Sequence, residues 1–200
     1  MGRAPSTPAR MIATVLITCV AAASALSGTY MLTRDRIIEQ ERAAEVAALQ
    51  AVLPDAAEFA EADELLDDAI EAAGDVPVSA VYRATDTSGA PAGWGVRVAP
   101  RGYAGPIQLI VGLDRDGLVT GVSIITMNET PGLGTKIVTE PGWMDQFTGW
   151  DGSDIDSAAR DYDGIAGATK SAVAIRNGVT AAGSAFAEVL SQASEEVQAQ

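Results

Sequence analysis

The stretch from Asp163 to Ser171 combines small residues and hydroxyl groups immediately before a predicted helix. Gly167 and Ala168 are small enough to let a bulky ligand approach the backbone. Thr169 and Ser171 lie where capping residues begin a helix. The N–H groups and the dipole at that end of a helix favour an anion such as a phosphate. The Thr169 hydroxyl is therefore predicted at a phosphate-binding position, and the alternative is an ordinary helix cap.

The helix that follows is predicted from the period of its apolar residues. They recur at intervals of four and three after Ala172, which forms one face of an amphipathic helix: Ile175, Val179, Ala182, Phe186 and Val189. Lys170, next to Thr169, adds a positive charge. It either faces solvent or contacts a bound phosphate.

A second stretch, Glu129 to Gly134, reads Glu-Thr-Pro-Gly-Leu-Gly. Pro131, Gly132 and Gly134 predict a constrained turn with exposed backbone. From the residues alone, this turn is either a structural connector or a ligand-lining loop.

Together the two stretches resemble the FMN-binding domain of the G subunit of the Rnf ion-translocating oxidoreductase. The C subunit of the sodium-pumping NADH:quinone reductase is a relative of that family. In the family, the last Thr of the pattern Asp-x-x-Ser/Thr-Gly-Ala-Thr carries FMN through a phosphoester bond, and it maps onto Thr169. The usual Ser or Thr three residues before it is Ala166 here, and a His often found before the Glu is Met127. The resemblance also takes in residues 33–37, 102–107 and 143–147, and so covers nearly the whole chain in order.

The resemblance implies a covalent FMN on Thr169. Further flavin contacts are expected from the two stretches: Glu129, Thr130, Gly132, Leu133, Gly167, Ala168, Lys170 and Ser171. The implied role is a one-electron relay in a subunit of an ion-translocating oxidoreductase that is not active alone. The implied partners are the other subunits of the membrane complex and a flavin transferase. The alternatives are a membrane-anchored structural or binding module without flavin, and the C subunit of the sodium pump, which is typically longer.

Composition excludes several other chemistries. The 200 residues, 48% of them hydrophobic, suit one compact domain and a membrane segment. The net charge of −14 argues against nucleic-acid binding through a basic patch. Without histidine, the chain cannot form a His-ligated haem site or a Ser-His-Asp triad. Cys19 is the only cysteine, which excludes an internal disulfide and a four-cysteine iron–sulfur cluster. Redox chemistry in this chain therefore requires an organic cofactor.

An uncharged run, Met11 to Leu32, follows an N-terminal segment of residues 1–10. As a helix the run spans about 33 Å, enough to cross a hydrocarbon core of about 30 Å. A cleaved signal peptide ending near Ala23-Ser24-Ala25 is the alternative, but its apolar region usually stops at about 15 residues. The run therefore favours an uncleaved lipid-embedded anchor. The positive-inside bias is weak. The resemblance implies a single-pass protein of the cell inner membrane, with the N-terminus cytoplasmic and the main domain periplasmic.

Residues 33–75 contain thirteen acidic and three basic side chains. Apolar residues between Ile37 and Leu53 have helical spacing up to Pro54, and Leu65 to Ile70 suggests a second short helix. We predict an acidic helical stalk. Its charges are either a solvated face or a docking surface for a partner.

Residues 76–192 are predicted to form the FMN-binding domain. Runs rich in Val, Ile and aromatic residues, separated by turn signals, predict four strands: Val78 to Thr85, Trp94 to Val98, Ile107 to Leu113 and Leu118 to Ile125. Asp116-Gly117 predicts an antiparallel hairpin between the last two. Trp143 and Phe147 predict a short helix, residues 148–163 a surface loop, and residues 193–200 a frayed tail. The fold class is thus α+β: one transmembrane helix, then a mixed domain with an antiparallel sheet and a C-terminal amphipathic helix.

Overall fold

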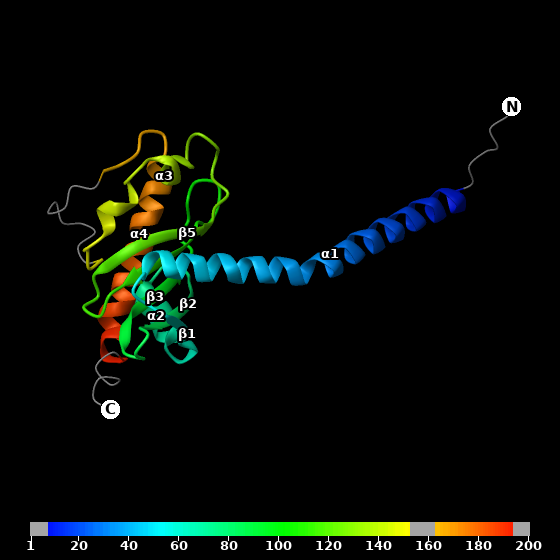
Figure 1. The fold of residues 1–200 in the computed structure, drawn as a ribbon. Coiled ribbons are helices and arrows are strands. Elements are labelled where there is room, and N and C mark those ends of the chain that lie inside the picture. The colour runs from blue at the N-terminus through cyan, green and yellow to red at the C-terminus, as the bar shows by residue number, and fades with distance from the viewer. Residues whose placement is uncertain (1–7, 153–162, 194–200) are drawn as a thin grey trace. The chain divides into compact units, whose positions relative to one another are not determined.

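The structure is a computed structural model and describes residues 8–152 and 163–193 (Figure 1). The predicted tail, most of the predicted 148–163 loop and the first seven residues of the N-terminal segment lie outside the described residues, apart from Ala193. The chain divides into two units that meet between Ala44 and Glu45. Residues 45–75, which the sequence assigns to a stalk, belong to the second, compact unit together with the sheet.

The first unit consists of the N-terminal part of helix α1 (Pro8–Val52). By length and composition α1 can cross a membrane, and no residue of its most apolar window is buried within the protein. Threonine hydroxyls along it donate to backbone carbonyls one turn earlier, as Thr14 does to Arg10 at 2.8 Å and Thr29 to Ala25 at 3.0 Å. Such bonds satisfy polar groups that a hydrocarbon environment would leave unpaired. The predicted N-terminal helix is confirmed, and it ends before Pro54, which cannot continue a helix.

The second unit is built on a five-stranded antiparallel sheet of order β1-β2-β3-β4-β5, in which neighbours in sequence pair with each other. Its strands are β1 (Glu58–Glu61), β2 (Val78–Thr85), β3 (Pro91–Val98), β4 (Gln108–Leu113) and β5 (Val119–Thr126). The four predicted strands and the β4–β5 hairpin are confirmed. The sequence analysis did not predict β1, because its residues, Glu-Phe-Ala-Glu, lie within the acidic segment.

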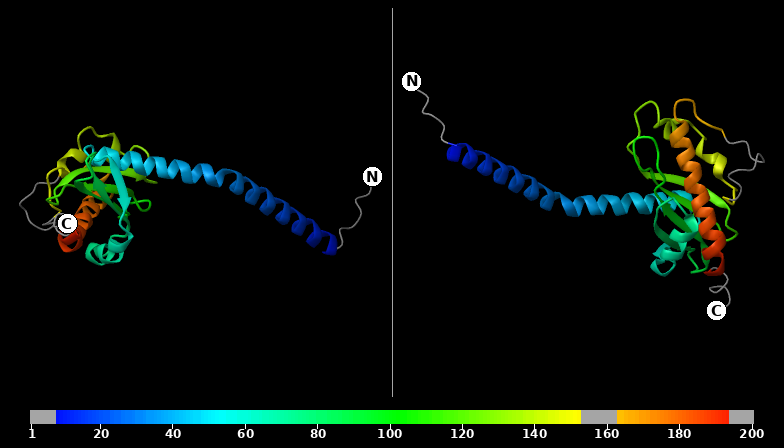
Figure 2. Two further views of the ribbon diagram at one scale, coloured as in Figure 1. Left: turned by 60° about the horizontal axis from the view of Figure 1, so that its bottom comes forward. Right: turned by 180° about the vertical axis from the view of Figure 1, so that it is seen from behind.

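Helices cover both faces of the sheet. A 3₁₀ turn (Asp63–Leu65) leads into α2 (Leu66–Ala73), which confirms the predicted second helix. The predicted C-terminal helix is also confirmed: α4 (Thr169–Ala185) continues into a π-helical turn, Phe186–Leu190, and runs along the sheet (Figure 2). Between β5 and α4 lie the short helix α3 (Lys136–Thr139) and a 3₁₀ turn, Met144–Phe147. The predicted helix at residues 143–147 is thus a single 3₁₀ turn.

Alternate residues of the strands point to two separate cores, as the period of two requires. The larger core joins α2 and α4 to one face of the sheet, with buried side chains that include Val81, Val96, Val98, Leu109, Val111, Ala172, Ile175 and Val179. The smaller core joins the end of α1 to the other face: Ala48, Leu49, Val52, Leu53, Ala56, Ala80, Tyr82, Ala84 and Ile110.

The end of α1 packs directly on strand glycines. A Cβ added to Gly95 would lie 2.5 Å from Leu49 Cδ2, and one added to Gly112 would lie 2.7 Å from the Val52 carbonyl oxygen. The Thr120 hydroxyl donates a hydrogen bond to that same carbonyl. Because glycine has no Cβ, these two positions let the end of α1 lie directly against the strands.

A polar cluster borders this smaller core. Glu45 accepts hydrogen bonds from the Tyr82 hydroxyl at 2.6 Å and from Arg97 Nη1 at 2.8 Å. Arg97 Nη2 also donates to Gln108 Oε1 at 2.7 Å. Burial raises the pKa of Tyr82 well above its usual value, and the hydrogen bond to Glu45 raises that pKa further.

Candidate functional site

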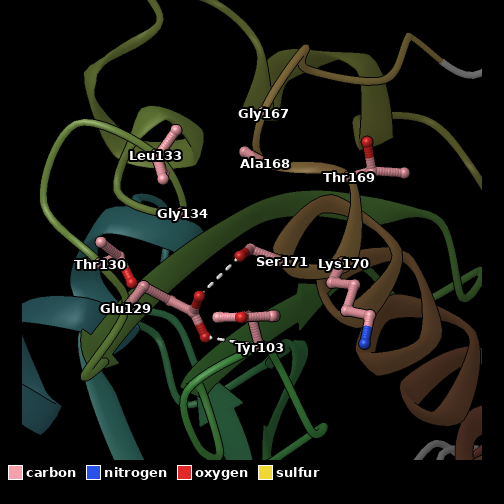
Figure 3. A pocket seen from close by; sticks show the side chains of 10 residues that line it. All are labelled: Tyr103, Glu129, Thr130, Leu133, Gly134, Gly167, Ala168, Thr169, Lys170 and Ser171. Atoms are coloured by element: carbon pink, nitrogen blue, oxygen red, sulfur yellow. Dashed lines mark hydrogen bonds between the residues drawn. The ribbon is translucent and has the colours of Figure 1, made fainter.

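An open pocket of about 370 Å³ lies at the start of α4 (Figure 3). Three segments far apart in the sequence meet there: the loop after β3, the loop after β5, and the turn into α4. The lining residues are Tyr103, Glu129, Thr130, Leu133, Gly134, Gly167, Ala168, Thr169, Lys170 and Ser171. Its volume is within the range of small-molecule sites, about 300–1,000 Å³.

The start of α4 differs from the predicted helix cap. Ala168 is the residue at the N-cap, and no side chain caps the helix. Thr169 is instead the first helical residue and is exposed, and the Ser171 hydroxyl is directed to Glu129. The alternative of an ordinary helix cap at Thr169 is therefore not what the structure has, since Ala168 stands at the N-cap. No side chain of residues 8–152 or 163–193 caps the N–H groups at this end of α4, which leaves the positive end of the helix dipole available to an anion.

Gly167 shapes the turn that leads into the helix. Its φ of +85° lies in the left-handed region, which residues with a Cβ rarely adopt. The Ala168 N–H donates to the Ile165 carbonyl at 2.9 Å and closes this turn. The turn places Thr169 on the pocket wall.

Glu129 lies on the pocket wall and is only 6% exposed. Its Oε1 accepts hydrogen bonds from the N–H groups of Tyr103, at 2.9 Å, and Ala104, at 3.2 Å. Its Oε2 accepts a bond from the Ser171 hydroxyl at 2.9 Å. Figure 3 shows the Glu129 side chain between Tyr103 and Ser171. One carboxylate thus joins the three segments that form the pocket.

Two glycines make room for this carboxylate. A Cβ added to Gly102 would lie 2.3 Å from Glu129 Oε1, and one added to Gly134 would lie 2.4 Å from Oε2. Real Cβ atoms do not approach an oxygen so closely, so any larger residue at either position would displace Glu129. Glycine is therefore required at Gly134, the last residue of the Glu-Thr-Pro-Gly-Leu-Gly stretch, because the side chain of its first residue, Glu129, fills the space beside it.

The rim of the pocket exposes apolar surface. Tyr103 is 69% exposed and Leu133 is 50% exposed. Lys170 Nζ lies 5.5 Å from the centroid of the Tyr103 ring, a cation–π arrangement. These side chains offer a planar, partly aromatic ligand both apolar contact and a nearby positive charge.

The segment before Thr169 is held by residues that the sequence analysis did not select. Lys136 Nζ donates to the Ala166 carbonyl at 3.0 Å, and Trp143 Nε1 donates to the Asp163 carbonyl at 2.6 Å. The Asp163 N–H donates to Gln146 Oε1 at 3.1 Å. The region after β5 thus positions the backbone of the Gly-Ala-Thr turn. Trp143 and Gln146 lie in the 143–147 stretch of the family resemblance, but contacts between main-chain atoms and distant side chains could not be predicted from it.

Eight of the nine residues predicted at the site line the pocket. The ninth, Gly132, lies in the same loop, where its φ is +76° and its N–H donates to Thr135 Oγ1 at 2.9 Å. Tyr103 and Gly134 also line the pocket and were not predicted. Both belong to stretches that carry the family resemblance, which is the signal that selects them.

Comparison with known proteins gives three findings. The model of the FMN-binding domain family matches residues 102–184, which include all ten lining residues. The chain is 39% identical over 133 residues to the G subunit of the Na⁺-translocating ferredoxin:NAD⁺ oxidoreductase complex of Acetobacterium woodii, covering 64% of this chain and 63% of that protein. It is 33% identical over 174 residues to the G subunit of the ion-translocating oxidoreductase complex of Stutzerimonas stutzeri, covering 82% of this chain and 74% of that protein.

The chain spans slightly less than two thirds of the length of the first of these relatives. Among solved structures, NqrC of Shewanella oneidensis aligns with a TM-score of 0.45 and 20% identity over 61% of this chain and 62% of that one.

Proposed function

Because the chain belongs to the family of G subunits of ion-translocating oxidoreductase complexes and contains their FMN-binding domain, we propose that it is an FMN-carrying electron-transfer subunit. The complex it serves would be membrane-bound and would couple electron transfer to ion translocation. The observation that carries the proposal is the position of Thr169 on the wall of a pocket formed by both signature stretches.

The residues of the pocket fit FMN. Tyr103 and Leu133 expose flat apolar surface that suits an isoalloxazine ring, and the glycine at 134 keeps the wall beside Glu129 free of side chains. The start of α4, which no side chain caps, and the charge of Lys170 suit a phosphate. The pocket therefore offers both apolar surface and groups that attract an anion, as the two ends of FMN require.

We propose that the link is a phosphoester between Thr169 Oγ and the FMN phosphate. Thr169 is exposed, so a separate flavin transferase can reach its hydroxyl. With FAD as donor, the Oγ–P bond forms while the pyrophosphate bond of FAD breaks. AMP leaves, and the hydroxyl proton passes to the transferase or solvent. Because the domain would lie outside the cytoplasmic membrane, covalent attachment prevents FMN from diffusing away.

The rest of the chain supports a relay role. Bound FMN supplies a group that accepts and donates single electrons. The sequence has no histidine and a single cysteine, Cys19, within α1, so the chain itself cannot form a His-ligated haem site or a four-cysteine iron–sulfur cluster. The helix α1 is one candidate span, and a single helix cannot enclose an ion path. Ion translocation would therefore belong to the other subunits.

For the topology we propose an uncleaved anchor at Met11 to Leu32 in the inner membrane, with the N-terminus cytoplasmic and the compact unit periplasmic. The uncharged, exposed run of α1 supports the anchor, and the family resemblance implies the orientation. The intact mass of protein extracted from membranes tests the anchor. A mature chain that begins near Leu26 would contradict it.

The attachment is tested by producing the chain together with a flavin transferase. Wild-type protein is expected to fluoresce in a denaturing gel and to carry the added mass of FMN. Thr169→Ala is expected to lose both signals. Thr130→Ala is the matched control, because Thr130 is another exposed threonine of the pocket, and it should keep them.

Two outcomes would contradict the proposal. Fluorescence that persists in Thr169→Ala would place the link elsewhere. Unlabelled wild-type protein would favour the alternative of a structural module without flavin.

A further inference from the structure

Apart from tyrosine and tryptophan, Glu129 and Ser171 are the only buried polar side chains among residues 8–152 and 163–193, and they are bonded to each other on the pocket wall. Burying a carboxylate is costly unless hydrogen bonds compensate for the lost water. All three bonds to Glu129 come from neutral groups: two backbone N–H groups and one hydroxyl. The bonds therefore satisfy the oxygens of the carboxylate without a positive partner that would cancel its charge.

A glutamine would fulfil the same structural role. Its amide oxygen can accept from the N–H groups of Tyr103 and Ala104, and its NH₂ group can donate to the Ser171 hydroxyl oxygen. The fold thus requires a side chain of this shape with a hydrogen-bond acceptor at position 129, but it does not require the negative charge. A charge that costs free energy to bury and that the fold does not need points to a functional role for that charge.

We propose that Glu129 sets the reduction potential of the flavin in this pocket, lowering it by placing a fixed negative charge on the wall beside the ring. The inference rests on the proposed function, since it requires FMN in the pocket. Full reduction adds two electrons to the ring, and part of their charge is neutralised by protons. A nearby negative charge opposes the added electron density, and water screens this repulsion poorly because the Glu129 side chain is only 6% exposed.

The size of the effect follows from Coulomb's law. A unit charge within roughly 10 Å, at an effective dielectric constant near 20, changes the equilibrium constant for adding one electron by about tenfold. Glu129→Gln removes the charge and keeps the hydrogen-bonding shape. It is therefore expected to favour the reduced flavin by about that factor.

The experiment is a reductive titration of the flavinylated full-length chain in detergent. Dithionite supplies both electrons and is itself oxidised, and the buffer supplies the protons. The midpoint potential is read from the flavin absorbance against a reference dye. Glu129→Gln is expected to have a more positive midpoint potential than wild type.

Two control variants separate the charge from other effects. Glu188→Gln also removes one carboxylate, but Glu188 lies in the π-helical turn beyond the far end of α4 and is exposed. Its potential should equal that of wild type. Ser171→Ala removes one donor to Glu129 and keeps the charge, so its potential should not become more positive. A positive shift in Ser171→Ala equal to that of Glu129→Gln would assign the effect to the hydrogen bond and overturn the inference.

A second measurement applies if Glu129→Gln is not flavinylated. In the Thr169→Ala background, the Kd values for oxidised and reduced free FMN report the same quantity through a thermodynamic cycle. Adding Glu129→Gln should strengthen binding of reduced FMN relative to oxidised FMN by about tenfold. An unchanged potential, or an unchanged ratio of Kd values, would overturn the role of Glu129 while leaving the flavin proposal intact. Wild-type protein that binds no flavin in either form would instead contradict the proposed function itself.

Discussion

The two faces of the sheet achieve close packing in opposite ways. On the face toward α4, the sheet supplies large side chains and the helix makes room for them: a Cβ added to Gly178 would lie 3.2 Å from Val98 Cγ2 and 3.5 Å from Leu109 Cδ1. On the face toward the end of α1, the helix supplies large side chains and the strands make room with glycines, as Gly95 does for Leu49. The small residues lie in the helix on one side and in the sheet on the other.

This difference separates the face that carries the candidate site from the face that only packs against α1. The α4 face ends at the pocket, so its helix carries Thr169, the proposed attachment residue, and Ser171, which bonds to the buried carboxylate. The α1 face carries none of the ten lining residues and brings the helix into contact with the strand backbone. Substitutions at the two faces should therefore have separable effects, the first on the cofactor and the second on stability.

The largest expected effect is on the α4 side. Thr169→Ala should abolish electron flow through the assembled complex, because the flavin is the redox centre proposed for this chain, which has no histidine and a single cysteine. The chain should remain in the complex, since the cores at both faces do not include the Thr169 side chain. Complex activity in membranes and pull-down of the other subunits measure the two effects.

Two results would contradict this separation. Normal turnover with unflavinylated protein would refute the relay role. Loss of the chain from the complex would show that assembly depends on the cofactor.

On the α1 side, Gly112→Ala should destabilise the compact unit by about 1–3 kcal/mol, the usual cost of forcing an extra methyl group into a packed core. The added Cβ would lie 2.7 Å from a backbone oxygen, that of Val52, which cannot move without moving the helix. The flavinylated fraction should stay at the wild-type level. Urea unfolding and denaturing-gel fluorescence measure the two quantities.

Gly121→Ala is the matched control. Gly121 pairs with Gly112 across β4 and β5 and faces the same Val52, but its added Cβ would lie at an ordinary contact distance of 3.4 Å. It should change stability by much less than Gly112→Ala. Equal effects of the two substitutions would mean that close contact with α1 does not limit packing on this face.

The same contrast explains what the sequence could predict. The spacing of apolar residues predicted four strands and the final helix. An apolar residue at every second position, or at intervals of three and four, depends only on which side of the strand or helix is buried. The glycines at 95 and 112 look like ordinary strand residues, since their meaning depends on a helix about 40 to 60 positions earlier in the chain. Strand β1 was not predicted because its acidic residues are not typical of a strand. It forms through its pairing with β2.

At the site, family motifs selected eight residues of the pocket, but the bonds among them could not be predicted. Thr169 and Ser171 looked like helix caps because both residue types favour that role. The buried Glu129 carboxylate instead takes the Ser171 hydroxyl, a tertiary contact across 42 positions. A preference for capping reflects only the neighbouring residues, and it does not show that the Ser171 hydroxyl bonds to a distant carboxylate.

A smaller effect is expected at the polar border of the α1 core. Tyr82→Phe removes the hydrogen bond to Glu45 and should cost about 1 kcal/mol at neutral pH. The pKa of Tyr82 is raised in the folded protein, chiefly by burial. Above about pH 10 an unfolded tyrosine loses its proton while Tyr82 keeps its own, so the unfolded state binds fewer protons and stability falls as pH rises.

The wild-type protein should therefore lose more stability than Tyr82→Phe between about pH 9 and pH 11. Urea unfolding at the two pH values measures the difference, and tyrosinate absorbance of the folded protein follows the ionisation itself. Parallel losses in the two proteins would show that Tyr82 ionises freely in the folded state.

The smallest expected effect returns to the α4 side, at the position where the chain departs from the family pattern. The Ala166 side chain is exposed, and the residue is held through its carbonyl, which accepts a hydrogen bond from Lys136. Ala166→Ser keeps that backbone contact and adds a hydroxyl at the surface, so stability should change by less than about 0.5 kcal/mol.

Since Ser is a residue that the family pattern has there, the flavinylated fraction should rise or stay the same, as measured by denaturing-gel fluorescence per mole of protein. Ala166→Val is the control, because it adds bulk without a hydroxyl. A gain with Ser but not with Val would mean that the transferase uses the hydroxyl, whereas equal labelling of all three proteins would mean that backbone geometry suffices. A fall in Ala166→Ser alone would contradict the assignment of residue 166 to the attachment motif.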